Sequence, residues 1–133
     1  MPYQIRPSAD GKIIYVVVAG RMDFESSPPV FVETAQWLER YPEAAILVDV
    51  REALYIPSVS DARHFVRRHN EITMSKRNPH ALVTASGVNF GMAMMMSTLI
   101  EISGGKSQAF TDLEEAERWL LDELEQRSSS PRP

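Results

Sequence analysis

The chain has 133 residues, of which 44% are hydrophobic and 24% charged, ordinary values for one globular domain. A net charge of −4 argues against non-specific nucleic-acid binding, which requires a positive surface, and the lack of cysteine excludes disulfides, thiolate catalysis and cysteine-ligated zinc. The opening residues, MPYQIRPSADGK, lack the apolar stretch of a signal peptide, and no apolar run reaches the roughly 18 residues of a membrane span. We therefore expect a cytoplasmic protein.

The first part of the sequence predicts a hairpin followed by a helix. Residues 3–7 and 12–20 are strand-like runs on either side of an Asp10-Gly11 turn signal. The next segment predicts a helix that begins at Pro28 and ends before Pro42, with Ser27 as its N-cap. The side chains expected on its inner face are Phe31, Thr34, Ala35 and Leu38.

After this helix, predicted strands alternate with predicted helices. Residues 44–50 and 80–86 are continuous apolar runs typical of strands covered on both faces, and residues 107–110 predict a last short strand. Helices are predicted over residues 58–77, 88–100 and 112–126. The alternation implies right-handed crossovers, hence a mostly parallel sheet of about five strands with helices on both faces. The sequence thus predicts a single α/β domain that opens with an antiparallel hairpin.

Three segments carry a family resemblance: DGKIIYVVVAGRMD (10–23), ILVDVREAL (46–54) and AFTDLEEAERWLL (109–121). With the order of elements, they resemble the STAS fold of sulfate transporters and anti-sigma factor antagonists. The resemblance is closest to its stand-alone bacterial offshoot, described as STAS-like or CRAL-TRIO-like and mostly of unknown function. It covers roughly residues 3–124, and we expect a STAS-like domain over residues 1–126 and a disordered tail over residues 127–133.

Ser58 has two interpretations. On the resemblance, it falls where anti-sigma factor antagonists carry the serine of an Asp-Ser-x-Gly motif that a partner kinase phosphorylates. Pro57 replaces the acidic residue of that motif, and Ser60 replaces its glycine. From its own surroundings, Ser58 is a helix N-cap with Asp61 as its partner three residues on. The sequence favours the cap and keeps the phospho-switch as the alternative.

Polar residues follow the predicted parallel strands at the edge where ligands bind in such sheets. We interpret Asp49 and Arg51 first as an ion pair, and alternatively as the polar end of a ligand site. That site would lie between the strand ends and the first turn of the helix over residues 88–100. The residues expected at the edge are Arg21, Asp23, Asp49, Arg51, Ser58, Thr84, Ser86 and Asn89. The candidate ligand-binding residues are Asp49, Arg51, Ser86, Asn89, Phe90, Met92 and Met94.

The segment GMAMMMSTL, residues 91–99, predicts a helix that is apolar on every side. Phe90, Met94 and Ile102 face one way on a helical wheel; Met92, Met96, Leu99 and Ile100 face another. Core packing explains one face, and a subunit interface or an apolar pocket explains the other. We predict a homodimer whose interface involves Met92, Met95 or Met96.

The sequence contains no recognisable catalytic motif, and neither a cofactor nor a metal is expected. His69 is predicted to pack beside Phe65 and Ile72, and His80 has no partner at metal-ligand spacing. The exposed basic side of residues 63–68 indicates a solvated surface, or alternatively a docking site for an acidic partner or lipid headgroup. The leading hypothesis is a non-enzymatic binding or regulatory module that acts through protein–protein interaction. The alternative is a carrier or sensor of a small apolar or lipid-like ligand.

Overall fold

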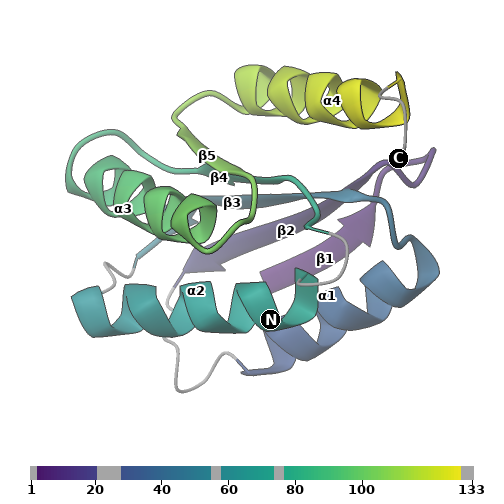
Figure 1. Ribbon diagram of the computed structural model, residues 1–133. Coiled ribbons are helices and arrows are strands. Elements are labelled where there is room, and N and C mark those ends of the chain that lie inside the picture. Colours follow the sequence, from purple (N-terminus) through teal and green to yellow (C-terminus); the bar gives the residue numbers. More distant parts are fainter. Residues whose placement is uncertain (1–2, 21–27, 55–57, 74–76, 130–133) are drawn as a thin grey trace.

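The computed structural model describes residues 3–20, 28–54, 58–73 and 77–129. These residues form a five-stranded sheet with strand order β1-β2-β3-β4-β5 (Figure 1). β1 is antiparallel to β2, and every other neighbouring pair is parallel. The elements are β1 Tyr3–Pro7, β2 Ile13–Gly20, α1 Pro28–Arg40, β3 Ala45–Ala53, α2 Val59–Thr73, β4 His80–Val83, α3 Val88–Ile102, β5 Ser107–Phe110 and α4 Leu113–Ser129. This arrangement confirms the predicted α/β domain with its opening hairpin.

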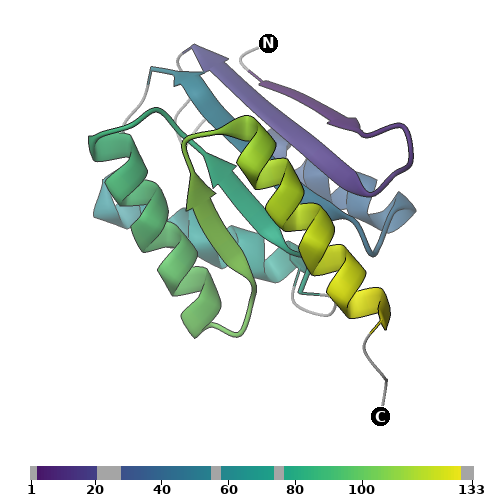
Figure 2. The same ribbon diagram turned by 90° about the horizontal axis from the view of Figure 1, so that it is seen from above.

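The helices are divided unequally between the two faces of the sheet. α1, α2 and α3 cover one face, and α4 alone covers the other (Figures 1 and 2). The parallel strands are added one after another in the same direction, so three right-handed crossovers place all three connecting helices on one side. The larger core therefore lies under α1, α2 and α3, and a smaller core lies under α4.

Alternation along β3 shows how the two cores are separated. Ile46 and Val48 point into the larger core, and Ala45 and Leu47 point into the smaller one. All four are buried, which explains why this strand is an uninterrupted apolar run in the sequence. The next residue with the parity of Leu47 is Asp49, whose side chain therefore belongs to the face that α4 covers.

The turn of the hairpin requires glycine at position 11. Asp10 accepts hydrogen bonds from the Ser8 hydroxyl at 2.7 Å and from the backbone N–H of Lys12 at 3.1 Å. Gly11 then has φ 71°, and a Cβ at this position would lie 2.6 Å from the ring of Tyr41. Backbone conformation and close contact with Tyr41, which directly follows α1, thus both disfavour a side chain here.

α1 begins at Pro28, as predicted, and Phe31, Thr34 and Leu38 of its expected inner face are buried. The Thr34 hydroxyl donates to the carbonyl of Val30 at 2.7 Å, so a polar residue is accommodated in the core. The predicted N-cap, Ser27, lies outside the described residues.

The expectation of a disordered tail from residue 127 is wrong for its first three residues. α4 continues to Ser129, because Leu124 still packs on the smaller core and Arg127 donates a hydrogen bond to the carbonyl of Arg77. Residues 130–133 lie outside the described residues. In the part of the chain that the structure describes, no helix is both long enough and apolar enough to cross a membrane.

Candidate functional site

The parallel strands bring three helix N-termini to one edge of the sheet. α2, α3 and α4 begin a few residues after the carboxyl ends of β3, β4 and β5. This is the edge at which α/β sheets of this kind bind ligands. The sequence-predicted residues Asp49, Arg51, Ser58, Ser86 and Asn89 lie at or near it, whereas Arg21 and Asp23 lie outside the described residues.

Asp49 and Arg51 form a two-pronged ion pair, as the sequence favoured. Arg51 Nη2 lies 2.8 Å from Asp49 Oδ2, and Arg51 Nε lies 3.0 Å from Oδ1. The backbone N–H of Arg51 also donates to Oδ1 at 3.1 Å. The hydrogen bond to Asp49 raises the pKa of Arg51, and Asp112 at the start of α4 adds a weaker effect in the same direction. Both carboxylate oxygens are thus engaged within the chain, which leaves Asp49 poorly suited to hold a ligand.

The predicted pocket between this ion pair and the first turn of α3 is wrong in its position. Asp49 lies on the α4 face of the sheet, whereas Met92 packs against the larger core on the opposite face. The sheet itself separates the two groups. Ser86 is exposed, and Asn89 is half-buried with an Oδ1 atom that has no hydrogen-bond partner among the described residues.

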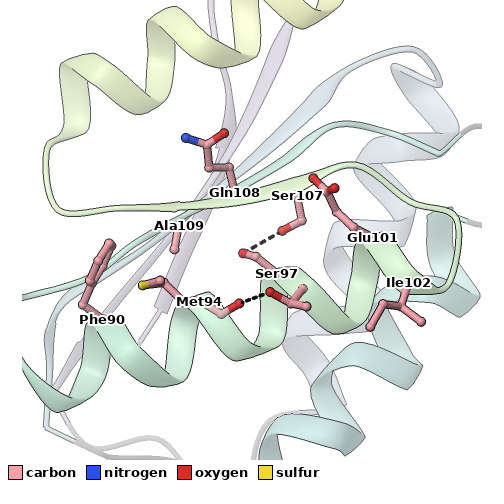
Figure 3. A pocket seen from close by; sticks show the side chains of 9 residues that line it. Phe90, Met94, Ser97, Glu101, Ile102, Ser107, Gln108 and Ala109 are labelled. Carbon is pink, nitrogen blue, oxygen red and sulfur yellow. Dashed lines mark hydrogen bonds between the residues drawn. The ribbon is translucent and has the colours of Figure 1, made fainter.

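An open groove lies elsewhere, between edge strand β5 and the outer side of α3 (Figure 3). Its volume is about 670 Å³. Two of the predicted ligand-binding residues, Phe90 and Met94, line it, but Asp49 and Arg51 do not. The lining residues are Phe90, Met94, Ser97, Thr98, Glu101, Ile102, Ser107, Gln108 and Ala109.

Ser58 caps α2. Its hydroxyl accepts a hydrogen bond from the backbone N–H of Asp61 at 3.1 Å, and the Asp61 carboxylate accepts one from the backbone N–H of Ser58 at 3.1 Å. This reciprocal pair is the capping box that the spacing predicts, with Asp in the place of Glu. Ser58 is exposed, and so are two large apolar side chains close to it in the sequence, Leu54 (75%) and Val59 (52%).

Comparison with known proteins adds evidence on the fold. No family model matches the sequence, and no curated protein matches it. An uncharacterized DUF3478-family protein from Shewanella loihica, with a SpoIIAA-like fold, superposes with a TM-score of 0.62 at 17% identity, covering 89% of this chain and 91% of that chain. The anti-sigma factor antagonist SpoIIAA, in its unphosphorylated form, gives 0.57 at 11% identity, covering 88% and 96%. The chain has the SpoIIAA-like, STAS-type fold. At sequence identities this low, the comparison shows a shared fold and nothing further.

Within this SpoIIAA-like fold, the methionines of α3 differ in how deeply they are buried, and the interface predicted for Met92 or Met95 stays a prediction. Met96 is 6% exposed and belongs to the larger core, so it is unavailable for a subunit interface. Met92 and Met95 are half-buried and pack against the same core. The exposed methionine is Met94, at 51%. The outer side of α3 therefore carries Met94 and Ile102. The helical wheel had correctly placed these two residues on a different side from Met96.

A buried polar chain that sequence reasoning missed lies beneath the groove. His80 Nδ1 lies 2.9 Å from the Ser107 hydroxyl, which donates to the Ser97 hydroxyl at 3.0 Å. The ring of His69 packs against that of His80, with centroids 4.5 Å apart. Burial lowers the pKa of His69 to about 4 and that of His80 well below its usual value. His80 and Ser107 each open a strand, which was the only signal in the sequence that they are neighbours.

The exposed surface of α2 is basic. Arg63, His64 and Arg67 are exposed, and Arg68 pairs with Glu71 at 2.8 Å while its guanidinium lies over the ring of Phe31. Among the residues that the structure describes, no three histidine, aspartate or glutamate side chains lie close enough to hold a metal ion.

Proposed function

We propose that the protein is a STAS-like regulatory module that binds another protein through the surface around Ser58. The fold supports this proposal, since the solved structures that share it include an anti-sigma factor antagonist. The observation that carries it is the position of Ser58: an exposed hydroxyl at a helix N-terminus, close in the sequence to Leu54 and Val59, both with more than half of their surface exposed. Exposed apolar side chains next to a modifiable group suit a contact that a charge can break.

In this proposal, phosphorylation of Ser58 is the switch. A phosphoryl group adds about −1.5 to −2 charges, and the N-terminus of α2 tolerates them because its dipole favours anions. The fold therefore survives the modification, while a partner packed on Leu54 and Val59 meets a new desolvation penalty. A carboxylate at position 58 imitates part of this change.

The test compares partner binding by Ser58→Asp with binding by a matched variant, Ser128→Asp, on the exposed surface of α4. Proteins captured from the cells that make this chain are identified by mass spectrometry, and the tryptic peptide containing Ser58 is searched for a phosphoryl group. We expect a partner that wild type and Ser128→Asp retain and Ser58→Asp loses. Equal capture by all three proteins, with no phosphorylated peptide, would refute the proposal.

A carrier or sensor of a small apolar or lipid-like ligand is the second candidate function. The groove along β5 favours it, because Phe90, Met94 and Ile102 offer an apolar wall and Ser97 a polar group. Its openness to solvent weighs against it, since a lipid chain needs an enclosing wall. Native mass spectrometry of the protein purified from its own cells distinguishes the two functions: a bound small molecule supports the carrier. A cytoplasmic location and a homodimer stay predictions.

A further inference from the structure

The outer face of α3 is almost uncharged although it is exposed. Among the fifteen residues of the helix, only Glu101 carries a charge. Val88 is 69% exposed, Met94 51% and Ile102 76%. The hydroxyl of exposed Thr98 donates to the carbonyl of Met94 at 2.9 Å, so its polar group is satisfied within the helix. An apolar helix face of this size is typical of a protein interface.

The residues of this face are arranged almost symmetrically about the middle of the helix. Val88 and Ile102, both large and apolar, lie at its two ends, and the smaller residues Gly91 and Thr98 lie between them and the centre. Met94 lies one residue before the midpoint of the helix. An antiparallel copy of the same helix would place Ile102 opposite Val88, Thr98 opposite Gly91, and Met94 close to its own counterpart. Such self-complementarity is what a two-fold interface requires.

The N-terminus of α3 lacks a partner that an antiparallel copy would supply. Its N-cap is Gly87, which provides no side-chain hydrogen bond to the first turn. The one charged residue of the helix, exposed Glu101, lies thirteen positions after Val88. In the antiparallel register described above, Glu101 of one copy lies beside the first turn of the other α3. A carboxylate is favoured there by the free N–H groups and the helix dipole.

We infer that two copies of this chain associate through antiparallel α3 helices, with Glu101 of each copy at the uncapped N-terminus of the other. A second copy of the chain fits the exposed face of α3 because its Glu101 carboxylate complements the positive N-terminal end of the helix. The two Glu101 side chains would lie about 20 Å apart along the helices, at 1.5 Å per residue, so like charges do not meet. Met94 and Ile102 also border the groove beside β5, which side chains of the second copy would fill (Figure 3). This association does not depend on the role proposed for Ser58.

The first experiment measures the mass of the full chain by sedimentation over a range of concentrations. Wild type should be a dimer at micromolar concentration, and Met94→Glu should be a monomer with the melting temperature that wild type has when it is dilute enough to dissociate. Leu121→Glu is the matched control, because Leu121 is 42% exposed on α4, across the sheet from α3. A monomeric wild type, a dimeric Met94→Glu or a monomeric Leu121→Glu would each overturn the inference.

The second experiment uses the absence of cysteine from the chain. Met94→Cys should form a covalent dimer on mild oxidation, because position 94 faces its own counterpart across the two-fold axis. Val88→Cys alone should stay monomeric on denaturing gels, whereas an equimolar mixture of Val88→Cys and Ile102→Cys should cross-link. Cross-linking of Val88→Cys alone, or failure of the mixture, contradicts the antiparallel register.

The third experiment isolates the contact made by Glu101. Glu101→Gln removes two symmetric charge–dipole contacts and should weaken dimerisation by about threefold to thirtyfold. Asp122→Asn, an exposed acid on α4, changes the net charge equally and should leave the dimer unaffected. The same dissociation constant for wild type and Glu101→Gln excludes the capping contact.

Discussion

At the start of α2, the Ser58 hydroxyl and the Asp61 carboxylate each hold the other residue's backbone N–H. Ser58→Ala should therefore lower the free energy of unfolding by about 1 kcal/mol, the usual cost of losing an N-cap. Ser58→Asp should stay close to wild type, because aspartate caps equally well. Urea unfolding measures both, with Ser60→Ala in the same helical turn as the control. A wild-type midpoint for Ser58→Ala contradicts the cap.

The buried histidines predict a dependence of stability on pH. The pKa of His69 is about 4 in the folded protein and about 6.5 when unfolded, so the unfolded chain binds more protons between these values. Stability should be complete above pH 6.5 and fall as the pH drops towards 4, by on the order of 3 kcal/mol for His69 alone. His80, whose pKa is also lowered, acts in the same direction.

Urea unfolding at intervals from pH 7.5 to 4.5 measures this slope. The control is His64→Gln, which changes an exposed histidine of the same helix and leaves both buried rings in place. His69→Gln removes one of the two buried imidazoles and should flatten the curve. A wild-type stability that is constant across this range would show that the two buried rings do not resist protonation.

For contacts between individual residues, sequence reasoning succeeded where the two interacting residues are close together in the chain. The Ser58 capping box and the Asp49–Arg51 pair span three and two residues, so spacing alone predicts them. The contact between His80 and Ser107 spans 27 residues and depends on the register of β4 against β5. Nothing in either residue's neighbourhood encodes that register, which is why the polar chain beneath the groove was missed.

The two sides of α3 differ sharply in what a mutation should cost. Met96 is 6% exposed in the larger core, so Met96→Ala should lower the free energy of unfolding by about 2–5 kcal/mol. Met94→Ala should change monomer stability by less than about 0.5 kcal/mol, because Met94 is 51% exposed. Urea unfolding compares the stabilities of the two variants, at protein concentrations below the dissociation constant of the dimer. Similar losses for the two variants would contradict the orientation of the helix.

The sequence of α3 does not predict which side of the helix packs against the sheet. Its apolar residues surround the helix on every side, so no periodicity identifies the face that packs on the sheet. In amphipathic α1 and α2, Phe31, Thr34, Leu38 and His69 are buried as predicted, because charged residues mark the outer side. The position of the ligand pocket failed for a related reason: the strand order decides that α3 and Asp49 lie on opposite faces, and alternating hydrophobicity does not report strand order.

For the molecule as a whole, the smaller core depends on a single helix. Leu120 of α4 is fully buried against Ala45, Leu47, Ala81 and Val83. Leu120→Ala should therefore lower the free energy of unfolding by about 2–5 kcal/mol, in one cooperative transition observed by both circular dichroism and tryptophan fluorescence. Leu121→Ala, on the exposed side of α4, is the control. Separate transitions for the two probes would indicate that α4 detaches independently.

The strictly sequential strand order also affects how the chain is made. Each parallel strand finds its neighbour already synthesised, so the sheet can grow at one edge as the ribosome advances. The face that α4 will cover, however, stays bare until the last helix has emerged. A chain that is released from the ribosome without the residues from Leu113 onward exposes the aliphatic side chains that four strands direct towards α4, and such a surface is a substrate for chaperones. Released chains that end just before and just after α4 should therefore differ in chaperone binding more than released chains that end around any earlier helix.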